Sequence, residues 1–550
     1  MSNLPGFESL EKLRRDYPYF DLATRRFCGT GKGAKQGGVP LFCDAQARRV
    51  YIDSRDTHTL VFGSTGSLKT RTVVSPTIQL LGYAGESMII NDPKGELFAR
   101  HAGNLRRLGF DVIEVNLRDP ELGNAWNPLA IPYRLYREGL RDKAAEFIND
   151  IALNLLSGRK HTDDPFWSYA AANLFGGLTH LLFRYSLDHD VPETGVNIAS
   201  LLQLRRVLFS GPKMARNTAL WQYAAEDEII SASMSGTVFA PRETMESILA
   251  VFDQGVHDLA IHSALLDMMS NSDFDIGDIC RRKTAVFLIA PDEKTSFHSL
   301  VSLFVKESYE YLIYLASQQE EGKVPIRLHY ILDEFSSLPK IADMPSMISA
   351  ARSRDIRFLL VLQSRSSLRE RYGDEAETIL SNCTNWIFFT SRELELLQYL
   401  SELCGRKRNR EPNISVFELQ HLNKERGEAL LLADRHLPAR VQMLDIDRFG
   451  DKSYVRLEHE RHPRSPRTAL TFELSPEIQE RVAPTPPPAK HRAVEPFPPG
   501  ELFARDTPAR PSWDRTLDET LDEIAKVKAD LAYWRKTHPE EQSTGKGENQ

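Results

Sequence analysis

Eight short apolar runs constrain the fold of this 550-residue chain more than any other feature. They are rich in strand-forming residues, nearly continuous, and mostly followed by turn residues or helical patterning. Strands that are buried on both faces of a parallel sheet have this pattern, so the runs predict an α/β fold with a doubly wound, mostly parallel sheet. The runs are Leu60 to Phe62, Met88 to Ile90, Val112 to Val115, Val286 to Ile289, Leu328 to Leu332, Phe358 to Leu362, Trp386 to Phe389 and Ala429 to Leu432.

A long segment with helical periodicity and few strand signals separates the third run from the fourth. It extends from Ile131 to Cys280 and includes pieces such as Lys143 to Leu156 and Phe166 to Tyr185. Because it is too long for a loop, we predict an all-α domain inserted into the sheet domain.

The composition changes after Arg461. The proline clusters at 484–488 and 496–499 predict an extended linker, and a last helix follows in which Leu517 to Trp534 recur at helical spacing. Such a helix can dock on its own domain, on another subunit or on a partner. The predicted organisation is an N-terminal segment (1–50), a nucleotide-binding domain in two parts (51–130 and 281–462), the inserted all-α domain (131–280), a proline-rich linker (463–512), and a C-terminal helix with a flexible polar tail (513–550).

Composition is that of soluble globular protein, with 41% hydrophobic and 26% charged residues. The sequence has no apolar run of about 18 residues and no apolar signal segment near its start, so we expect a cytoplasmic protein. Five scattered cysteines without a CxxC pair indicate neither a disulfide framework nor a zinc site. The net charge of −7 argues against a surface that is basic throughout, although Arg406 to Arg410 form a local basic patch.

A glycine loop at Gly63 to Thr70 follows the first apolar run. Its sequence, GSTGSLKT, fits the phosphate-loop pattern GxxxxGK[ST] except that Leu68 replaces the second fixed glycine. In such a loop, backbone N–H groups surround phosphate at a helix N-terminus. The residues predicted to bind nucleotide are Gly63, Ser64, Thr65, Gly66, Ser67, Leu68, Lys69, Thr70 and Arg71.

Lys69 would place its charge on the β- and γ-phosphates, and Thr70 would offer its hydroxyl to Mg²⁺. Leu68 adds a Cβ where the loop backbone packs against phosphate, which implies weaker binding or an altered loop. A strand-to-helix turn without a ligand is the alternative. The second glycine-lysine cluster, Cys28 to Gly38, has no convincing strand signal before it and no Lys-[ST] ending, and is interpreted as a flexible surface loop.

Two acids end the strand-like segment Ile326 to Glu334. We expect the strand to place Asp333 beside the phosphate loop of a neighbouring strand, where the carboxylate holds Mg²⁺ through its water shell. Glu334 can polarise the water that attacks the γ-phosphate. Alone, the acid pair is better explained by a helix N-terminus, where acids are favoured. Together with Lys69 and Thr70, it predicts ATP and Mg²⁺ as the ligands.

Further polar residues are expected at the same sheet edge. Gln363 ends the next strand and should stand beside the acid pair, where it can orient water or sense the γ-phosphate. The segment Asn91 to Glu96, at the end of the second run, also falls on the carboxyl edge. Arg352 and Arg354 could reach phosphate either in the same subunit or across an oligomer interface.

The chain resembles the type IV coupling proteins, the TraG/TraD-like ATPases of conjugation and type IV secretion. The likeness extends from His58 to Phe449 and is looser in the helical segment. The motifs that carry it, in order, are GSTGSLKT (63–70), INDPKGELF (90–98), NAWNPL (124–129), DDPFW (163–167), YILDEFSSLPKI (330–341), ARSRDIRFLLVLQS (351–364) and RYGDEAETILSNC (371–383).

This resemblance implies a RecA-like motor domain with an inserted all-α domain, assembled as a homo-hexamer at a secretion channel. It implies that ATP hydrolysis drives the transfer of relaxase-bound single-stranded DNA or of protein effectors. By the same likeness, Lys69 and Thr70 bind phosphate and metal, Asp333 and Glu334 are the second acidic motif, and Gln363 is the sensor. Arg352 matches the arginine that reaches a neighbouring subunit's nucleotide, with Arg354 as second choice.

Two departures from the family qualify the resemblance. Leu68 replaces a family glycine, and the N-terminal transmembrane helices of many members are missing. We therefore expect indirect membrane contact through a partner, at the cytoplasmic face of the inner membrane. Two other functions stay open, a non-hydrolysing adaptor that recruits substrate and a DNA-translocating motor unrelated to secretion.

Overall fold

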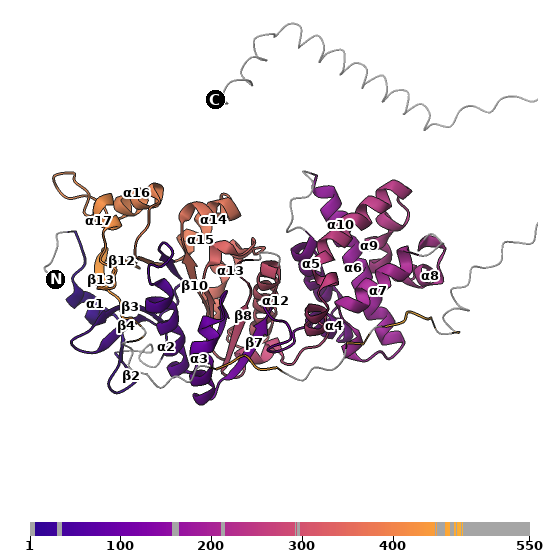
Figure 1. The fold of residues 1–550 in the computed structure, drawn as a ribbon, viewed down its shortest axis with the longest axis horizontal. Coiled ribbons are helices and arrows are strands. Elements are labelled where there is room, and N and C mark those ends of the chain that lie inside the picture. The colour runs from indigo at the N-terminus through magenta and orange to yellow at the C-terminus, as the bar shows by residue number, and fades with distance from the viewer. Residues whose placement is uncertain are drawn as a thin grey trace, which may run out of the picture. The chain divides into compact units, whose positions relative to one another are not determined.

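A mixed sheet of nine strands runs through the centre of the described structure (Figure 1). The computed structural model describes residues 6–29, 36–156, 164–210, 215–291, 293, 297–445, 447, 457–461, 467–468, 470–474 and 476. The strand order is β13-β12-β11-β5-β10-β9-β6-β8-β7. The strands are β5 (Thr59–Phe62), β6 (Ser87–Asn91), β7 (Asp111–Asn116), β8 (Thr284–Ile289), β9 (Leu328–Leu332), β10 (Ile356–Leu362), β11 (Asn385–Phe388), β12 (Glu428–Ala433) and β13 (Ala439–Gln442).

Neighbouring strands from β11 to β7 are all parallel, whereas β12 and β13 pair antiparallel at one edge. Each of the eight predicted runs coincides with one of the strands β5 to β12, which confirms the mostly parallel sheet. Strand β13 was not predicted, because its alternating burial marks a half-exposed edge strand that lacks a continuous apolar run.

A second, antiparallel sheet in the order β2-β1-β4-β3 was also missed. Its strands are β1 (Tyr19–Asp21), β2 (Arg26–Cys28), β3 (Val39–Asp44) and β4 (Arg49–Asp53), preceded by α1 (Leu10–Asp16). Two of these strands have only three residues, too few to show a period. Apolar side chains of β3 pack in the same core as α2 and β13, so this small sheet covers part of the central one.

The side chains of the parallel strands alternate between two hydrophobic cores. Val61, Ile331 and Val361 face a core formed with α2 (Ser75–Ala84) and α3 (Glu96–Arg107). Their sequence neighbours Leu60, Leu332 and Leu360 face a second core, formed with α12 (His298–Ser317) and α13 (Met344–Ala351). Helices therefore cover both faces of the sheet, as the continuous apolar runs require.

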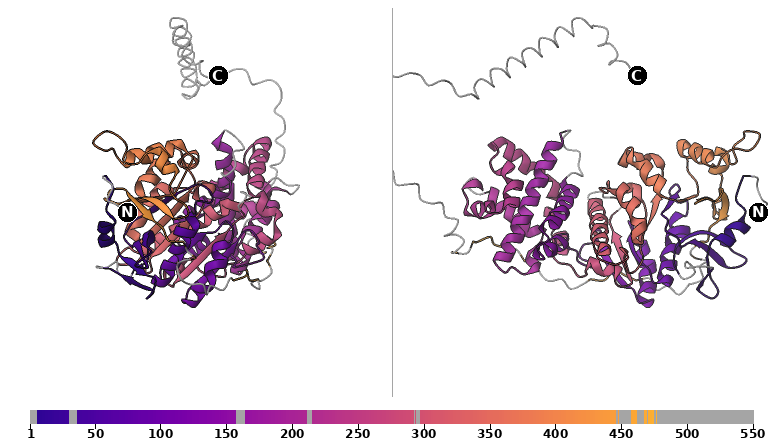
Figure 2. Two further views of the ribbon diagram at one scale, coloured as in Figure 1. Left: turned by 60° about the vertical axis from the view of Figure 1, so that its left-hand side comes forward. Right: turned by 180° about the vertical axis from the view of Figure 1, so that it is seen from behind.

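Helices connect β7 to β8, and no strand is described between them. They are α4 (Ala130–Arg137), α5 (Arg141–Leu156), α6 (Pro165–Asp188), α7 (Ile198–Phe209), α8 (Ala219–Ala225), α9 (Glu228–Val238), α10 (Arg242–Ile261) and α11 (Ser263–Met268). Figure 2 shows them grouped in one bundle. The predicted helices 143–156 and 166–185 are confirmed in α5 and α6. The domain boundaries stay predictions, and the C-terminal helix and most of the linker lie outside the described residues.

Within the described residues, four further helices follow β10, namely α14 (Arg365–Tyr372), α15 (Glu375–Asn382), α16 (Leu394–Leu403) and α17 (Val416–Gln420). In the part of the chain that the structure describes, no helix combines the length and hydropathy needed to cross a membrane.

A buried lysine joins the helical bundle to the sheet. Lys306 of α12 has a 4% exposed side chain, and its Nζ lies 2.6 Å from Glu310 Oε1, 2.7 Å from Asp343 Oδ2 and 3.7 Å from Asp150 Oδ2 on α5. One cation thus faces three carboxyl groups. Burial, and then a hydrogen bond with the Glu310 carboxyl, raise the pKa of Asp150 to about 7.

A raised pKa makes the stability contribution of Asp150 depend on pH. The protonated carboxyl stabilises the folded state. This stability contribution is complete below pH 4 and is lost as the pH rises toward 7. We expect Asp150→Asn, which is always neutral, to gain about 1–2 kcal/mol of unfolding free energy relative to wild type between pH 4 and pH 8. Denaturant unfolding at both pH values measures this gain.

The matched control is Asp142→Asn, which changes an exposed side chain on the same helix and should leave the profile parallel to wild type. If the unfolding free energy of Asp150→Asn followed the same pH dependence as wild type, the raised pKa of Asp150 would be contradicted.

Candidate nucleotide-binding site

The predicted phosphate loop connects β5 to a helix. All four residues of β5 are buried, and Gly63 N donates to the Leu362 carbonyl at 3.2 Å, which ties the loop to the end of β10. Thr70 to Val74 form a π-helical turn that continues into α2. The predicted strand-loop-helix context is therefore present, and it directs the loop toward a helix N-terminus.

The loop presents backbone donors that have no acceptor. Ser64 N and Ser67 N are bonded to carbonyl groups, but no acceptor within the described structure faces the N–H groups of Gly66, Leu68 and Lys69. The buried hydroxyl of Ser67 also has no partner among the described residues. Unpaired N–H groups at a helix N-terminus are the donor set that binds phosphate oxygens.

Leu68 adopts the backbone conformation that glycine takes without cost. Its φ is +71°, and that of Gly66 is +73°. A left-handed leucine costs about 1–2 kcal/mol, yet the loop keeps its turn around Leu68. The side chain is half-buried, and it lines a hollow of about 280 Å³ beside the loop, called the second hollow below. Leu68 therefore places local backbone strain within the loop.

Lys69 lies folded over its own loop. Its Nζ donates to the Gly63 carbonyl and to the Ser64 carbonyl at 3.0 Å. The residue is 8% exposed, and burial lowers the pKa of Lys69, while Asp333 and Glu334 act in the opposite direction. An anion in the loop would compete with these two carbonyls for the ammonium group.

Thr70 and Asp333 are in direct contact, because Thr70 Oγ1 donates to Asp333 Oδ2 at 2.8 Å. The expectation that Asp333 follows a strand next to β5 is wrong, because β10 lies between β5 and β9. Asp333 is held by a 3.0 Å bond from Glu334 N and by Asn91 Nδ2, which donates to its carbonyl at 2.6 Å. Burial raises the pKa of Asp333. A hydroxyl beside a carboxylate fits the oxygen ligands that Mg²⁺ prefers.

Glu334 follows Asp333 with a left-handed backbone, φ +52°. It is half-buried and lines a pocket of about 440 Å³ together with Thr70 and Asp333. A non-glycine residue with this backbone stores strain of the kind found at active sites.

Asp92, which the sequence marks only as part of the segment Asn91 to Glu96, lines the same pocket. It follows β6, is 2% exposed, and accepts from Phe98 N at 2.7 Å. Burial raises the pKa of Asp92 to about 7. Its place at the carboxyl edge follows from the sequence, but the sequence alone does not show that Asp92 and Asp333 line one pocket. The pocket also receives Lys94 and Arg100.

Gln363 occupies the position predicted for it. It follows Leu362, the residue whose carbonyl anchors Gly63, and its strand lies between β5 and β9. The side chain is half-buried. Gln363 therefore stands between the phosphate loop and the acid pair.

Arg71 separates the two hollows. It lines both, and its guanidinium pairs with Asp445 at 2.9 Å and with Asp447. The second hollow is completed by residues 424–427 and 443.

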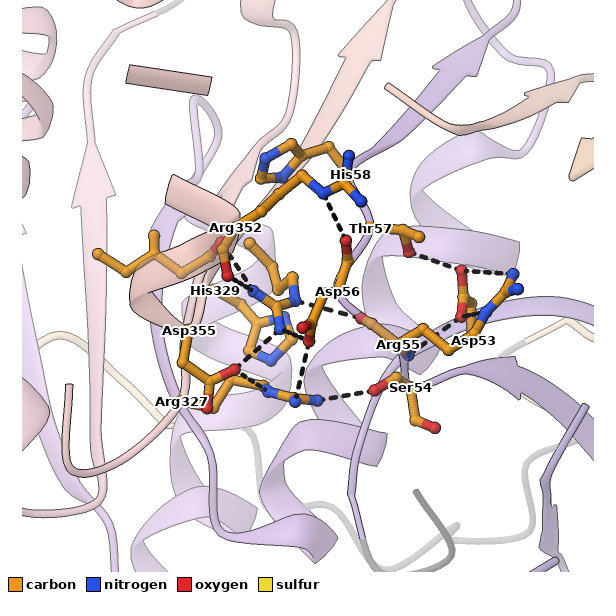
Figure 3. Close-up of polar contacts among 12 residues, drawn as sticks. Asp53, Ser54, Arg55, Asp56, Thr57, His58, Arg327, His329, Arg352 and Asp355 are labelled. Atoms are coloured by element: carbon orange, nitrogen blue, oxygen red, sulfur yellow. Dashed lines mark hydrogen bonds and ion pairs between the residues drawn. The ribbon is translucent and has the colours of Figure 1, made fainter. Parts of the chain in front are cut away.

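Arg352 lies at the opposite edge of the sheet. It precedes β10, whereas Gln363 follows it, and seven strand residues with a rise of about 3.3 Å each separate the two ends by about 20 Å. Arg352 therefore cannot contact a nucleotide in the same subunit, so the in-subunit alternative is wrong. Its guanidinium is exposed and bonds through Nε to the Asp56 carbonyl (Figure 3).

A family model described as type IV secretory system conjugative DNA transfer matches residues 23–480. The chain belongs to this family. Curated relatives of this chain include the conjugal transfer protein TraG of Escherichia coli, 25% identical over 417 residues, and the protein VirD4 of Rhizobium radiobacter, 24% identical over 406 residues. The aligned parts are 72% and 70% of this chain but 61% and 54% of those relatives, so the match spans less than two thirds of their length.

Solved structures of a bacterial conjugative coupling protein, TrwB, share the fold of this family member. The unbound form has a TM-score of 0.54 at 18% identity and covers 83% of this chain and 93% of that one. The complex with ADP and Mg²⁺ has a TM-score of 0.56 at 18% identity and covers 82% and 95%. Together with the large, mostly parallel sheet, these neighbours support the predicted doubly wound α/β fold.

The strain at Leu68 predicts an unusual stability order. Leu68→Gly releases the left-handed strain, whereas Leu68→Ala retains it, and both lose the same packing. Glycine gives the unfolded chain more conformational entropy, which offsets part of this gain. We still expect the glycine variant to have an unfolding free energy about 1 kcal/mol above that of the alanine variant. Denaturant unfolding without nucleotide measures the difference.

At Gln79, inside α2, the same pair of substitutions should give the opposite order, because alanine favours helix. A higher stability of Leu68→Ala than of Leu68→Gly would show that Leu68 is not strained.

Proposed function

We propose that this protein is an ATPase that couples ATP hydrolysis to the transfer of a macromolecule through a conjugation or type IV secretion channel. The observation that carries the proposal is the 2.8 Å contact between Thr70 and Asp333, which joins the phosphate loop to the acid pair across β10. Membership of the conjugative DNA transfer family supports the transfer role.

The γ-phosphate end of ATP would lie on the pocket side of the loop. There the unpaired N–H groups bind phosphate, Lys69 leaves its loop carbonyls for the β- and γ-phosphates, and Gln363 orients the attacking water. Glu334 accepts the proton of that water. Thr70 and Asp333 would hold Mg²⁺, which neutralises charge on the phosphates when bound. TrwB structures with ADPNP and with ADP and Mg²⁺ support this choice of ligands.

The base and ribose would extend to the other side of Arg71. The hollow of about 280 Å³ lies there, with Leu68 providing an apolar wall and Lys424 to Gly427 a polar one. This orientation keeps the γ-phosphate beside Asp333 and Glu334.

Arg352 would act in trans, which requires a ring of subunits, and we propose the hexamer. Its support is the position of Arg352 at the amino edge, remote from its own loop, with an exposed guanidinium that has one bond among the described residues. Arg354 fits less well, because it is half-buried and bonded to the Gly322 carbonyl at 3.0 Å.

The cargo would be relaxase-bound single-stranded DNA, a protein effector, or both. The helical bundle, predicted as the inserted all-α domain, and the C-terminal helix are the candidates for recruiting it. The ring would work at the cytoplasmic face of the inner membrane and reach channel components through a membrane partner.

Leu68 favours one other function, a non-hydrolysing adaptor that recruits substrate. The retained acid pair, Gln363 and Arg352 weaken this alternative, because a site that no longer hydrolyses ATP has no physical need for them. A DNA-translocating motor unrelated to secretion would share the same site chemistry. Stimulation of turnover by double-stranded rather than single-stranded DNA would favour that motor.

Glu334→Gln provides the most direct test of hydrolysis. The amide cannot accept the proton, so we expect kcat to fall by about 10²–10⁴-fold while binding of a fluorescent ATP analogue remains within about twofold of wild type. Substrate transfer in cells should be lost together with turnover.

Lys69→Ala should lose nucleotide binding as well, and Glu375→Gln, at an exposed acid paired with Lys340, is the matched control with normal turnover. Normal turnover and transfer in Glu334→Gln would refute the proposal.

A further inference from the structure

Three successive backbone carbonyls between β4 and β5 accept hydrogen bonds from three arginines (Figure 3). The donors come from the starts of β9 and β10 and from the turn before β10. Arg327 Nη1 donates to the Ser54 carbonyl at 2.9 Å, Arg357 Nε to the Arg55 carbonyl at 3.2 Å, and Arg352 Nε to the Asp56 carbonyl at 2.7 Å. The segment 54–56 is therefore fixed to the amino edge of the sheet at each residue.

Asp56 also supplies a charge to this cluster. Arg327 and Arg357 are 8% and 4% exposed, and buried guanidinium groups need anions nearby. Asp355 Oδ1 accepts from Arg327 Nε at 3.0 Å and from Arg357 Nη2 at 2.8 Å. The second carboxylate is that of Asp56, which pairs with Arg357 Nη2 and lies 3.7 Å from Arg327 Nη2. Its side chain is 66% exposed, so the charge approaches the buried pair from the surface.

The fixed segment continues into the strand of the phosphate loop. Phe358 N donates to His58 Nδ1 at 3.0 Å, so His58 Nε2 carries the hydrogen and donates to the Ile348 carbonyl at 2.8 Å. Burial lowers the pKa of His58 to about 3, which keeps this neutral form. Thr59, the next residue, begins β5, and Gly63 opens the loop. Arg352 is thus connected with the phosphate loop of the same subunit by its hydrogen bond to Asp56 and by the short segment from Asp56 through His58 into β5.

We propose that Asp56 is a positioning residue for Arg352. The Asp56 carboxylate fixes the segment 54–56 on Arg327 and Arg357. The Asp56 carbonyl then holds the Arg352 guanidinium toward the neighbouring subunit's nucleotide. Engagement of Arg352 then acts on β5 through residues 56–58, and this links the state of one nucleotide site to the phosphate loop of the next. The inference rests on the proposed trans role of Arg352.

Asp56→Asn tests the role, because the amide retains size and backbone carbonyl but loses the charge. We expect kcat to fall about tenfold, with KM for ATP within about twofold of wild type, since the site that binds ATP is remote. The double variant Asp56→Asn/Arg352→Ala should be no slower than Arg352→Ala alone. Asp56→Glu should recover most of kcat.

Asp434→Asn is the matched control, because Asp434 pairs with Arg55 Nη1 at 2.7 Å on the same edge but does not contact Arg352. Its kcat should be normal.

Mixed rings separate positioning from damage to the fold. Asp56→Asn subunits, which have an intact loop, should regain turnover when assembled with Lys69→Ala subunits, which are inactive but carry a well-placed Arg352. A normal kcat in Asp56→Asn, or additive losses in the double variant, would overturn the inference. So would mixed rings of Asp56→Asn and Lys69→Ala subunits that fail to recover turnover, if mixed rings of Arg352→Ala and Lys69→Ala subunits do recover it.

Failure of the proposed function gives a different result. Normal turnover in Arg352→Ala, with Lys69→Ala inactive, would remove the trans role and this inference with it, but leave the ATPase standing. Normal turnover in Glu334→Gln would remove the ATPase proposal itself.

Discussion

The hydrogen bond from Thr70 to Asp333 is the contact on which the nucleotide site depends. The two residues belong to strands that are not neighbours, and β10 lies between them. The contact is possible because all three strands are parallel and end at one edge of the sheet. That arrangement also places Gln363 between the loop and the acids.

Leu68 shows how a motif can lose a fixed residue and retain its geometry. Glycine is favoured at this position because its φ is positive, and leucine adopts the same φ at a cost of about 1–2 kcal/mol. The cost is local, because the loop remains hydrogen-bonded to β10 through Gly63 N and to the Thr390 carbonyl, just after β11, through Ser64 N. The substitution therefore costs the loop local conformational energy.

The sequence predicted the central strands and the carboxyl-edge residues because each depends on local patterns. Continuous apolar runs mark buried strands, and residues directly after them must lie at one edge. Strand order depends on long-range pairing, so the interposed β10 was missed. The same limit left two places open for Arg352, and only the sheet showed that it lies at the amino edge. Asp92 was missed because its direction depends on how Asn91 to Gly95 turn into α3.

A structure of the protein bound to a non-hydrolysable ATP analogue and Mg²⁺ tests the central claim most directly. We expect β- and γ-phosphates on the N–H groups of Gly66 to Lys69, with Mg²⁺ between Thr70 and Asp333. We also expect that Lys69 Nζ moves from the Gly63 and Ser64 carbonyls to phosphate. An empty loop at saturating analogue, with Lys69 still on those carbonyls, would contradict that claim.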